Sequence, residues 1–228
     1  MVRVLFMIAM LLAASGAAIA EGMPKGFVYL SDVDATIVQD MRYAGGGNFT
    51  GAPVPGYEAG ECVLAEPAAR ALARVQKRYA AEGKTLIIFD CYRPARAVRA
   101  FMAWTKSGKA ETDMRYHPRV RRDQLVAQGY IAARSGHSSG GSVDLSFGER
   151  DGFGRVVEAE MGGIFDLFDR RSHTASGEVG ATARANRRKL VEAMAREGFA
   201  NYAREWWHFR FSKEPFGGRV FDFPVTAR

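Results

Sequence analysis

The sequence predicts a single α+β domain in which a mostly antiparallel central sheet is flanked by helices. Three observations indicate this class: helical and strand-like segments are interleaved, the strands lack the regular βαβ repeat of a parallel sheet, and no linker or internal repeat divides the chain. A chain of 228 residues is long enough to bury one sizeable core. Its 47% hydrophobic and 25% charged residues are typical of a globular protein.

The first twenty residues have the features of a secretory signal peptide. Arg3 supplies the positive charge, an apolar run follows, and Ala18 and Ala20 are the small residues of a cleavage site. The apolar run is too short for a membrane anchor, which needs about twenty apolar residues. We therefore expect residues 1–20 to be removed, and residues 21–228 to form a periplasmic or secreted domain without a membrane span.

The number and distribution of charged residues indicate which kind of binding partner to expect. The chain carries 32 Lys and Arg against 25 Asp and Glu, a net charge of +7, and loss of the signal peptide removes one arginine, which leaves 31 basic residues and a net charge of +6. Basic and acidic residues are interspersed along the chain instead of forming a basic tract. The pattern therefore predicts no nucleic-acid partner, and for an exported protein it favours contact with an anionic cell wall.

The N-terminal half is expected to contain a strand, a loop and a helix. Residues 26–33 predict the first strand, and the glycine-rich stretch 44–60 predicts an ordered loop. A helix follows between Pro67 and Gly83, because Pro favours the first turn of a helix and Gly its end. Its apolar face repeats at helical spacing through Ala68, Leu72, Val75 and Tyr79.

Further elements alternate along the rest of the chain. Residues 85–89 are apolar and predict a buried strand, after which Pro94 opens a second helix. The inward face of that helix is expected to be Val98, Phe101, Met102 and Thr105. A third helix is predicted over 184–197, ended by Gly198. Its inward residues are expected to be Leu190, Val191 and Met194.

The two cysteines, Cys62 and Cys91, suggest a disulfide. An even count in an exported chain favours one bond between them. Such a bond would stabilise the fold by roughly 3 to 4 kcal/mol, by restricting the unfolded chain. Two buried thiols or two metal ligands remain as alternatives, although the sequence has no second Cys-x-x-Cys partner.

Two segments, 135–147 and 205–211, lack helical spacing and predict strands with turns. The first contains His137 and Asp144, and the glycine pair beginning at Gly140 disfavours a helix between them. A tight turn between two strand ends would bring both side chains together. Taken alone, this pattern fits a structural His–Asp hydrogen bond as well as a metal site.

The second segment adds His208 as a third ligand and Glu205 as an adjacent carboxylate. Three protein ligands and an open position for water are typical of a catalytic zinc site, in which a glutamate can serve as general base. Residues 205 and 208 would face opposite sides of a regular strand, so Glu205 must lie at a bend or where the strand begins. Trp206 and Trp207 are expected in the core or the pocket wall, and the two remaining histidines, His117 and His173, at the surface or behind the site.

A third cluster lies between the buried strand and the helix that Pro94 opens. Arg93 there is either an ordinary surface residue or the cation that stabilises a tetrahedral oxyanion. Asp90 would orient it through a charge-assisted hydrogen bond.

Together these clusters resemble the VanX-type D-alanyl-D-alanine dipeptidases, within the wider group of zinc D,D-peptidases with hedgehog-like folds. The resemblance spans most of the chain after the signal peptide. The matching segments are, in order, 40–43 with 48–51, 90–94, 135–144, 161–166 and 205–208. The first and fourth of these point to the dipeptidase branch.

The resemblance implies that His137, Asp144 and His208 bind one zinc ion per chain. Glu205 would be the general base, and Arg93 would stabilise the developing oxyanion.

The resemblance also implies a closed pocket for a short substrate. Tyr43 and Asp166 would bind its ammonium group, and Ser135 its carboxylate.

This chain departs from the family pattern at three positions. Ser142 stands where the family often has alanine, Gly136 replaces a residue that is frequently larger, and Cys91 stands where glycine is common. The first two are small residues in a turn and should alter its shape little. A bond between Cys91 and Cys62 would brace the strand that presents Arg93.

The activity expected from the resemblance is zinc-dependent hydrolysis of D-Ala-D-Ala to two D-alanines. The alternative is a murein D,D-carboxypeptidase or endopeptidase with the same metal chemistry but an open cleft. A third class, a zinc-binding or wall-binding module without activity, is disfavoured because Glu205 and Arg93 are both present.

Overall fold

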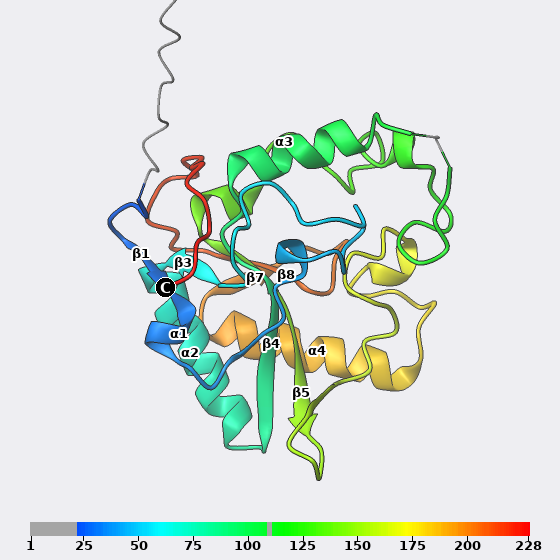
Figure 1. Ribbon diagram of the computed structural model, residues 1–228. Helices are drawn as coiled ribbons and strands as arrows, with labels where there is room; N and C mark the ends of the chain where they lie inside the picture. The colour runs from blue at the N-terminus through cyan, green and yellow to red at the C-terminus, as the bar shows by residue number, and fades with distance from the viewer. Residues whose placement is uncertain (1–21, 109–110) are drawn as a thin grey trace, which may run out of the picture.

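The computed structural model describes residues 22–108 and 111–228, so the predicted signal peptide at 1–20 lies outside the described residues. This part of the chain forms one α+β unit with a six-stranded sheet and a separate two-stranded sheet (Figure 1). Within it, no helix combines the length and the apolar character needed to cross a membrane.

The central sheet is mostly antiparallel, as predicted. Only its first pair of strands, β2 and β4, is parallel; every other pair in the sheet runs antiparallel. The strands in spatial order are β2 (Val38–Gln39), β4 (Lys84–Asp90), β5 (Ser142–Arg150), β8 (His208–Phe211) and β7 (Phe199–Asn201), with β6 (Val156–Glu158) paired to the outer part of β5. The long strand β5 thus pairs with three other strands, β4, β6 and β8, and forms the centre of the sheet.

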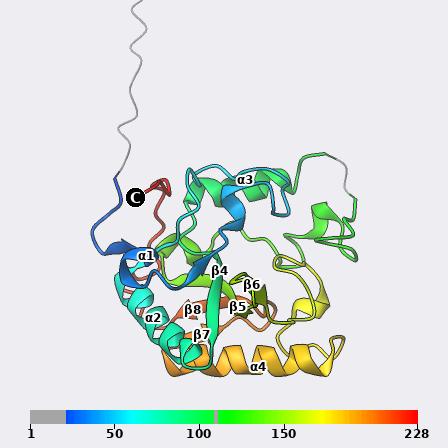
Figure 2. The ribbon, with the colours of Figure 1, turned by 60° about the horizontal axis from the view of Figure 1, so that its bottom comes forward.

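Helices cover both sides of this sheet. Figure 2 shows α2 (Glu66–Ala80) and α4 (Ala181–Arg196) on one side and α3 (Ala95–Trp104) on the other. All three predicted helices are confirmed, and Pro94 directly precedes α3. The inward residues of these helices are buried as expected, except that Met102 and Val191 are only half-buried.

The prediction of one strand over 26–33 is wrong in its second half. Strand β1 (Phe27–Tyr29) ends after three residues, and a short helix α1 (Leu30–Val33) follows. The reason is the partner strand β3 (Val63–Ala65), which offers only three residues for pairing. Beyond it the Leu30 amide donates to the Cys62 carbonyl (2.8 Å), and the chain turns away.

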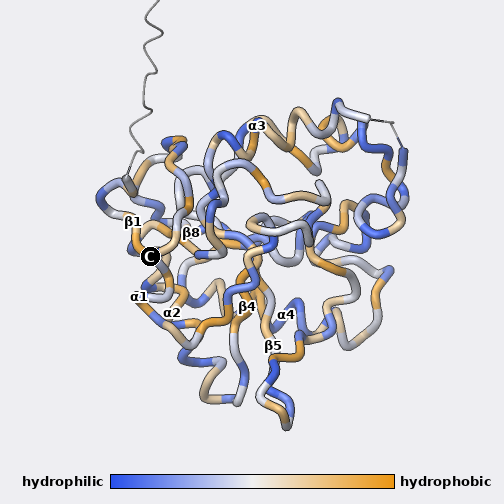
Figure 3. Tube along the Cα trace, in the orientation of Figure 1, coloured by the Kyte–Doolittle hydropathy of each residue, from blue (hydrophilic) through white to orange (hydrophobic). Residues whose placement is uncertain are grey.

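The core lies between the sheet and the helices. Figure 3 shows the hydrophobic middle of β4, where residues 86–89 are buried. Trp206 and Trp207 are 0% and 1% exposed. Trp206 belongs to the core alone, whereas Trp207 also lines the pocket described below. Both positions agree with the prediction that these tryptophans lie in the core or in the pocket wall.

The predicted disulfide between Cys62 and Cys91 is present, and both cysteines are buried. It joins the residue before β3 to the residue after β4. The Tyr92 amide donates to the Val63 carbonyl (2.8 Å) beside it, so the bond and this hydrogen bond hold the end of β4 against β3.

We expect the double variant Cys62→Ala, Cys91→Ala to lose about 3 to 4 kcal/mol of unfolding free energy, because the bond closes a loop across a sequence separation of 29. Urea denaturation followed by circular dichroism would measure the loss. Wild-type protein unfolded in the presence of a reductant is the matched control, and a loss below about 1 kcal/mol would contradict the expectation.

Candidate active site

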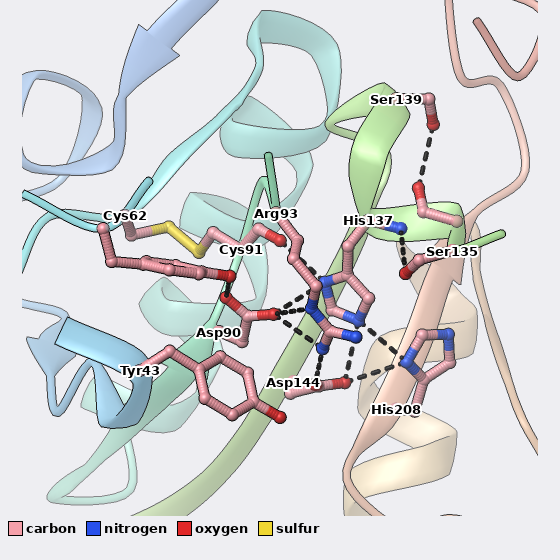
Figure 4. Close-up of polar contacts among 12 residues, drawn as sticks. Tyr43, Cys62, Asp90, Cys91, Arg93, Ser135, His137, Ser139, Asp144 and His208 are labelled. Carbon is pink, nitrogen blue, oxygen red and sulfur yellow. Dashed lines mark hydrogen bonds and ion pairs between the residues drawn. A yellow bond between two sulfur atoms is a disulfide. The ribbon is translucent and has the colours of Figure 1, made fainter. Parts of the chain in front are cut away.

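Three potential metal ligands meet where β5 and β8 pair. Asp144 on β5 lies opposite His208 on β8, and His137 lies in the 3₁₀ turn Gly136–Ser139 just before β5. His208 Nδ1 is 2.9 Å from Asp144 Oδ1, and His137 Nε2 is 3.0 Å from His208 Nδ1 and 3.2 Å from the same carboxylate oxygen (Figure 4). The sequence prediction that these side chains converge is confirmed.

The local structure of the first cluster differs from the prediction. His137 lies in a 3₁₀ turn and not at the end of a strand. Gly140 closes this turn with φ +75°, and a Cβ there would come within 2.3 Å of the Phe27 ring. Glycine is therefore required both for the backbone angle and for the close packing.

The geometry of the three ligand atoms fits a zinc ion. Zinc–nitrogen bonds of about 2.0 to 2.1 Å in a tetrahedral site place neighbouring donor atoms about 3.3 Å apart, close to the separations found here. Burial acts to raise the pKa of Asp144, but the neighbouring His137 and His208 outweigh it and hold this pKa well below its usual range. An ionised carboxylate with two imidazoles is a donor set that zinc prefers.

Backbone hydrogen bonding orients His137. The Cys91 carbonyl lies 2.6 Å from His137 Nδ1, and because a carbonyl oxygen only accepts, Nδ1 carries the proton. The lone pair is then on Nε2, the atom that faces His208 and Asp144. The disulfide-bonded residue Cys91 thus directly orients one of the three potential metal ligands.

Glu205 lies at a bend, as its spacing from His208 requires. The Glu205 amide donates to the Tyr202 carbonyl (2.9 Å), and β8 begins only at His208. Burial raises the pKa of Glu205 to about 7, with His208 opposing and Asp144 adding to the shift. A carboxyl group that titrates near neutral pH is suited to accept a proton and release it again.

Arg93 is held in place by two carboxylates. Its Nε donates to Asp90 Oδ2 (2.9 Å), and its Nη2 lies 3.5 Å from Asp144 Oδ2. The guanidinium also packs 5.1 Å from the centre of the Tyr43 ring. Asp90 is fully buried and accepts a second hydrogen bond from the Tyr57 hydroxyl (2.6 Å). The expectation that Asp90 orients Arg93 is confirmed.

Tyr43 and Asp166 form a buried polar pair in the same pocket. The Tyr43 hydroxyl is 2.9 and 3.1 Å from the two oxygens of Asp166. Burial raises the pKa of Asp166, and the nearby Asp144 raises it further. A cationic group that enters the pocket would offset the cost of ionising this carboxylate.

All the predicted site residues line one pocket of about 320 Å³, apart from the two cysteines that brace it. Ser135 is among them, and its Oγ accepts a hydrogen bond from the His137 amide (3.2 Å), which leaves its hydroxyl hydrogen free to donate elsewhere.

The sequence did not indicate the lining residues Phe49, Phe101, Tyr130, Ile131, Phe168 and Tyr202 as part of the site. Apolar and aromatic residues of this kind are equally common in a core, so no sequence signal distinguishes them.

The other two histidines do not line this pocket. His173 is half-buried. Of the two alternatives predicted for His117, a place at the surface is excluded, because its side chain is 2% exposed. Its Nδ1 lies 2.9 Å from the Val120 carbonyl, and its ring packs edge-on against Trp104. An internal hydrogen bond of this kind allows a polar ring to be buried.

Gly136 and Ser142, two of the departures from the family pattern, lie next to each other, and the small residue at one position leaves room for the side chain at the other. A Cβ added to Gly136 would lie 2.8 Å from Ser142 Oγ, which is closer than ordinary packing allows. Ser142 is fully buried, and its Oγ has no hydrogen-bond partner among the described residues. A small residue at 136 therefore accommodates the hydroxyl at 142.

We expect Gly136→Ala to lower the unfolding free energy by about 1 to 3 kcal/mol, through overpacking against Ser142. The double variant Gly136→Ala, Ser142→Ala should recover most of this loss, because it removes the hydroxyl. Thermal unfolding of the two single variants and the double variant forms the test. Additive losses would show that the two positions do not interact.

The chemistry that these groups offer together is hydrolysis assisted by a metal ion, so the fold and the site define a metallopeptidase. The chain belongs to the D-Ala-D-Ala dipeptidase family of M15 peptidases, whose family model matches residues 23–226.

Relatives of known function support this membership. A D-alanyl-D-alanine dipeptidase of Streptomyces coelicolor is 40% identical over 205 residues, which is 90% of this chain and all of the relative. That of Enterococcus faecium is 37% identical over 204 residues, 89% of this chain and again all of the relative. That of Escherichia coli is 32% identical over 170 residues, 75% of this chain and 76% of the relative.

Proposed function

We propose that this protein hydrolyses D-Ala-D-Ala to two molecules of D-alanine with the help of one zinc ion per chain. The observation that carries the proposal is the single pocket that holds the His–Asp–His cluster, Glu205, Arg93 and the Tyr43–Asp166 pair together. Each group matches one requirement of dipeptide hydrolysis, and the dipeptidase names of the relatives agree with it.

His137, Asp144 and His208 hold the zinc in this proposal. Bound zinc acts as a Lewis acid and lowers the pKa of water into the neutral range. Glu205 takes a proton from the attacking water and delivers it to the departing amine. Arg93, kept in position by Asp90, neutralises the charge that develops on the carbonyl oxygen.

The remaining polar groups select a short substrate with free ends. Asp166 and the Tyr43 hydroxyl bind the ammonium group, and the Ser135 hydroxyl donates to the carboxylate. An acylated stem peptide has no ammonium group to ionise the buried Asp166, so the pair Tyr43–Asp166 argues against the alternative of a murein carboxypeptidase or endopeptidase.

The setting that we propose is outside the cytoplasm. The features of residues 1–20 support export, and the buried disulfide suits an oxidising compartment. The enzyme would there act on dipeptide released near an anionic cell wall, towards which its net positive charge attracts it.

The test is hydrolysis of free D-Ala-D-Ala beside N-acetyl-D-Ala-D-Ala. Zinc-loaded protein should cleave the free dipeptide, lose activity on chelation and regain it with zinc. Asp166→Asn should raise KM for the free dipeptide by about 10-fold or more and weaken the preference over the acetylated one, because a charge-assisted contact to the ammonium is lost. A preference of the wild type for the acetylated peptide would instead support the carboxypeptidase alternative.

A further inference from the structure

Arg187 is a buried cation on α4 that the proposed reaction does not use. Its side chain is fully buried and lies over the ring of Trp206, with Cζ 5.9 Å from the ring centre. Among the described residues, no carboxylate forms an ion pair with it, and burial lowers its pKa to about 10. An arginine is rarely buried without an acidic partner, because the desolvation of its charge is costly.

The guanidinium of Arg187 binds backbone carbonyls at the two ends of one loop. Its Nε donates to the Met161 carbonyl (2.8 Å), and its Nη2 donates to the same oxygen. Its Nη1 donates to the carbonyls of Arg171 (2.9 Å) and His173 (2.8 Å). One side chain therefore joins the beginning and the end of the segment 161–173.

This segment carries Asp166 near its middle. Asp166 has φ +61°, and it is the one non-glycine residue with positive φ in the described part of the chain. A left-handed conformation of this kind is maintained only when the surrounding structure imposes it. Gly162, near the start of the segment, packs against the beginning of α4: a Cβ there would lie 2.7 Å from Val179, which precedes the helix, and 3.1 Å from Cβ of Ala183 in its first turn. The helix that bears Arg187 therefore supports the segment directly.

We propose that Arg187 is a positioning residue for substrate recognition: by closing the ends of segment 161–173, it holds Asp166 where the substrate ammonium binds. This inference rests on the proposed function, because it assigns the ammonium to Asp166. The flat fork of guanidinium donors reaches both ends of the segment at once, which the single ammonium of a lysine does not do. Charge alone is therefore insufficient at this position.

The experiment compares Arg187→Lys and Arg187→Met with Arg188→Met, a matched change at an exposed residue of the same helix. Both Arg187 variants should raise KM for free D-Ala-D-Ala by about 10-fold or more and reduce the preference over N-acetyl-D-Ala-D-Ala, with a smaller change in kcat. Arg188→Met should behave as the wild type. Zinc content and thermal unfolding are measured for each variant. The kinetics are then compared at a temperature at which every variant is folded and has zinc bound.

A double-variant comparison then separates positioning from general stability. If Arg187 acts through Asp166, adding Arg187→Lys to Asp166→Asn should raise KM little further. A full additional increase in KM, or a fall in kcat with KM and substrate preference unchanged, would overturn the proposal.

Hydrogen exchange of the zinc-loaded protein provides a test that does not depend on turnover. In Arg187→Lys, the amides of segment 161–173 should exchange at least about 10-fold faster, while those of β4 keep their protection. Unchanged exchange in the segment would refute the positioning role. Absence of D-Ala-D-Ala hydrolysis by the wild type would refute the proposed function instead, so the two failures are distinguishable.

Discussion

Glu205→Gln is expected to lower kcat for D-Ala-D-Ala by about 10³-fold, within the range that general acid–base catalysis contributes. Glutamine has the same shape but accepts no proton from the attacking water and delivers none to the leaving amine. Because Glu205 is not one of the three convergent ligands, zinc binding should persist. Steady-state kinetics together with the zinc content of the purified variant measure both effects.

Glu192→Gln is the matched control for this change, because Glu192 is exposed on α4 and does not line the active-site pocket. It should leave kcat within about 2-fold of the wild type, as expected for an isolated surface substitution. If Glu205→Gln retained more than a tenth of the wild-type kcat with zinc bound, Glu205 would not be the base.

Arg93→Lys should lower kcat by about 10²-fold or more, the magnitude typical for loss of one group that stabilises an oxyanion. Lysine keeps the positive charge but lacks the planar guanidinium, whose several N–H donors can form a hydrogen bond to Asp90 and face the reacting centre at the same time. The change also leaves Asp90 its bond from Tyr57, so the protein should stay folded. Kinetics at saturating substrate measure the loss.

The control for Arg93→Lys is Arg99→Lys on the neighbouring helix α3, where an exposed arginine pairs with Asp222. This surface change should have little effect on kcat. Equal activity of Arg93→Lys and the wild type would mean that a positive charge of any shape suffices at this position, and that the oriented fork is not part of catalysis.

Much of the secondary structure could be predicted because its signals are local. Pro67 and Pro94 mark the starts of α2 and α3, and apolar residues at helical spacing mark their inner faces. The first strand was mispredicted beyond Tyr29 because strand length depends on a partner distant in sequence, the three-residue strand β3. The sequence left open whether His117 lies at the surface or behind the site for a related reason, since its burial depends on contacts with Val120 and Trp104 that composition does not reveal.

The sequence alone indicated which residues could carry the chemistry: two histidines and an aspartate as candidate metal ligands, a glutamate three residues before one of the histidines, and an arginine in a separate segment earlier in the chain. Only the tertiary structure decided how they meet. The pairing of β5 with β8 places Asp144 opposite His208, the carbonyl of Cys91 orients His137, and α4 supports the segment that carries Asp166. These contacts join residues far apart in sequence, and hydrogen bonds to backbone carbonyls leave no pattern in the side chains. A motif can therefore indicate the groups of an active site, whereas their geometry follows from the packing of the whole fold.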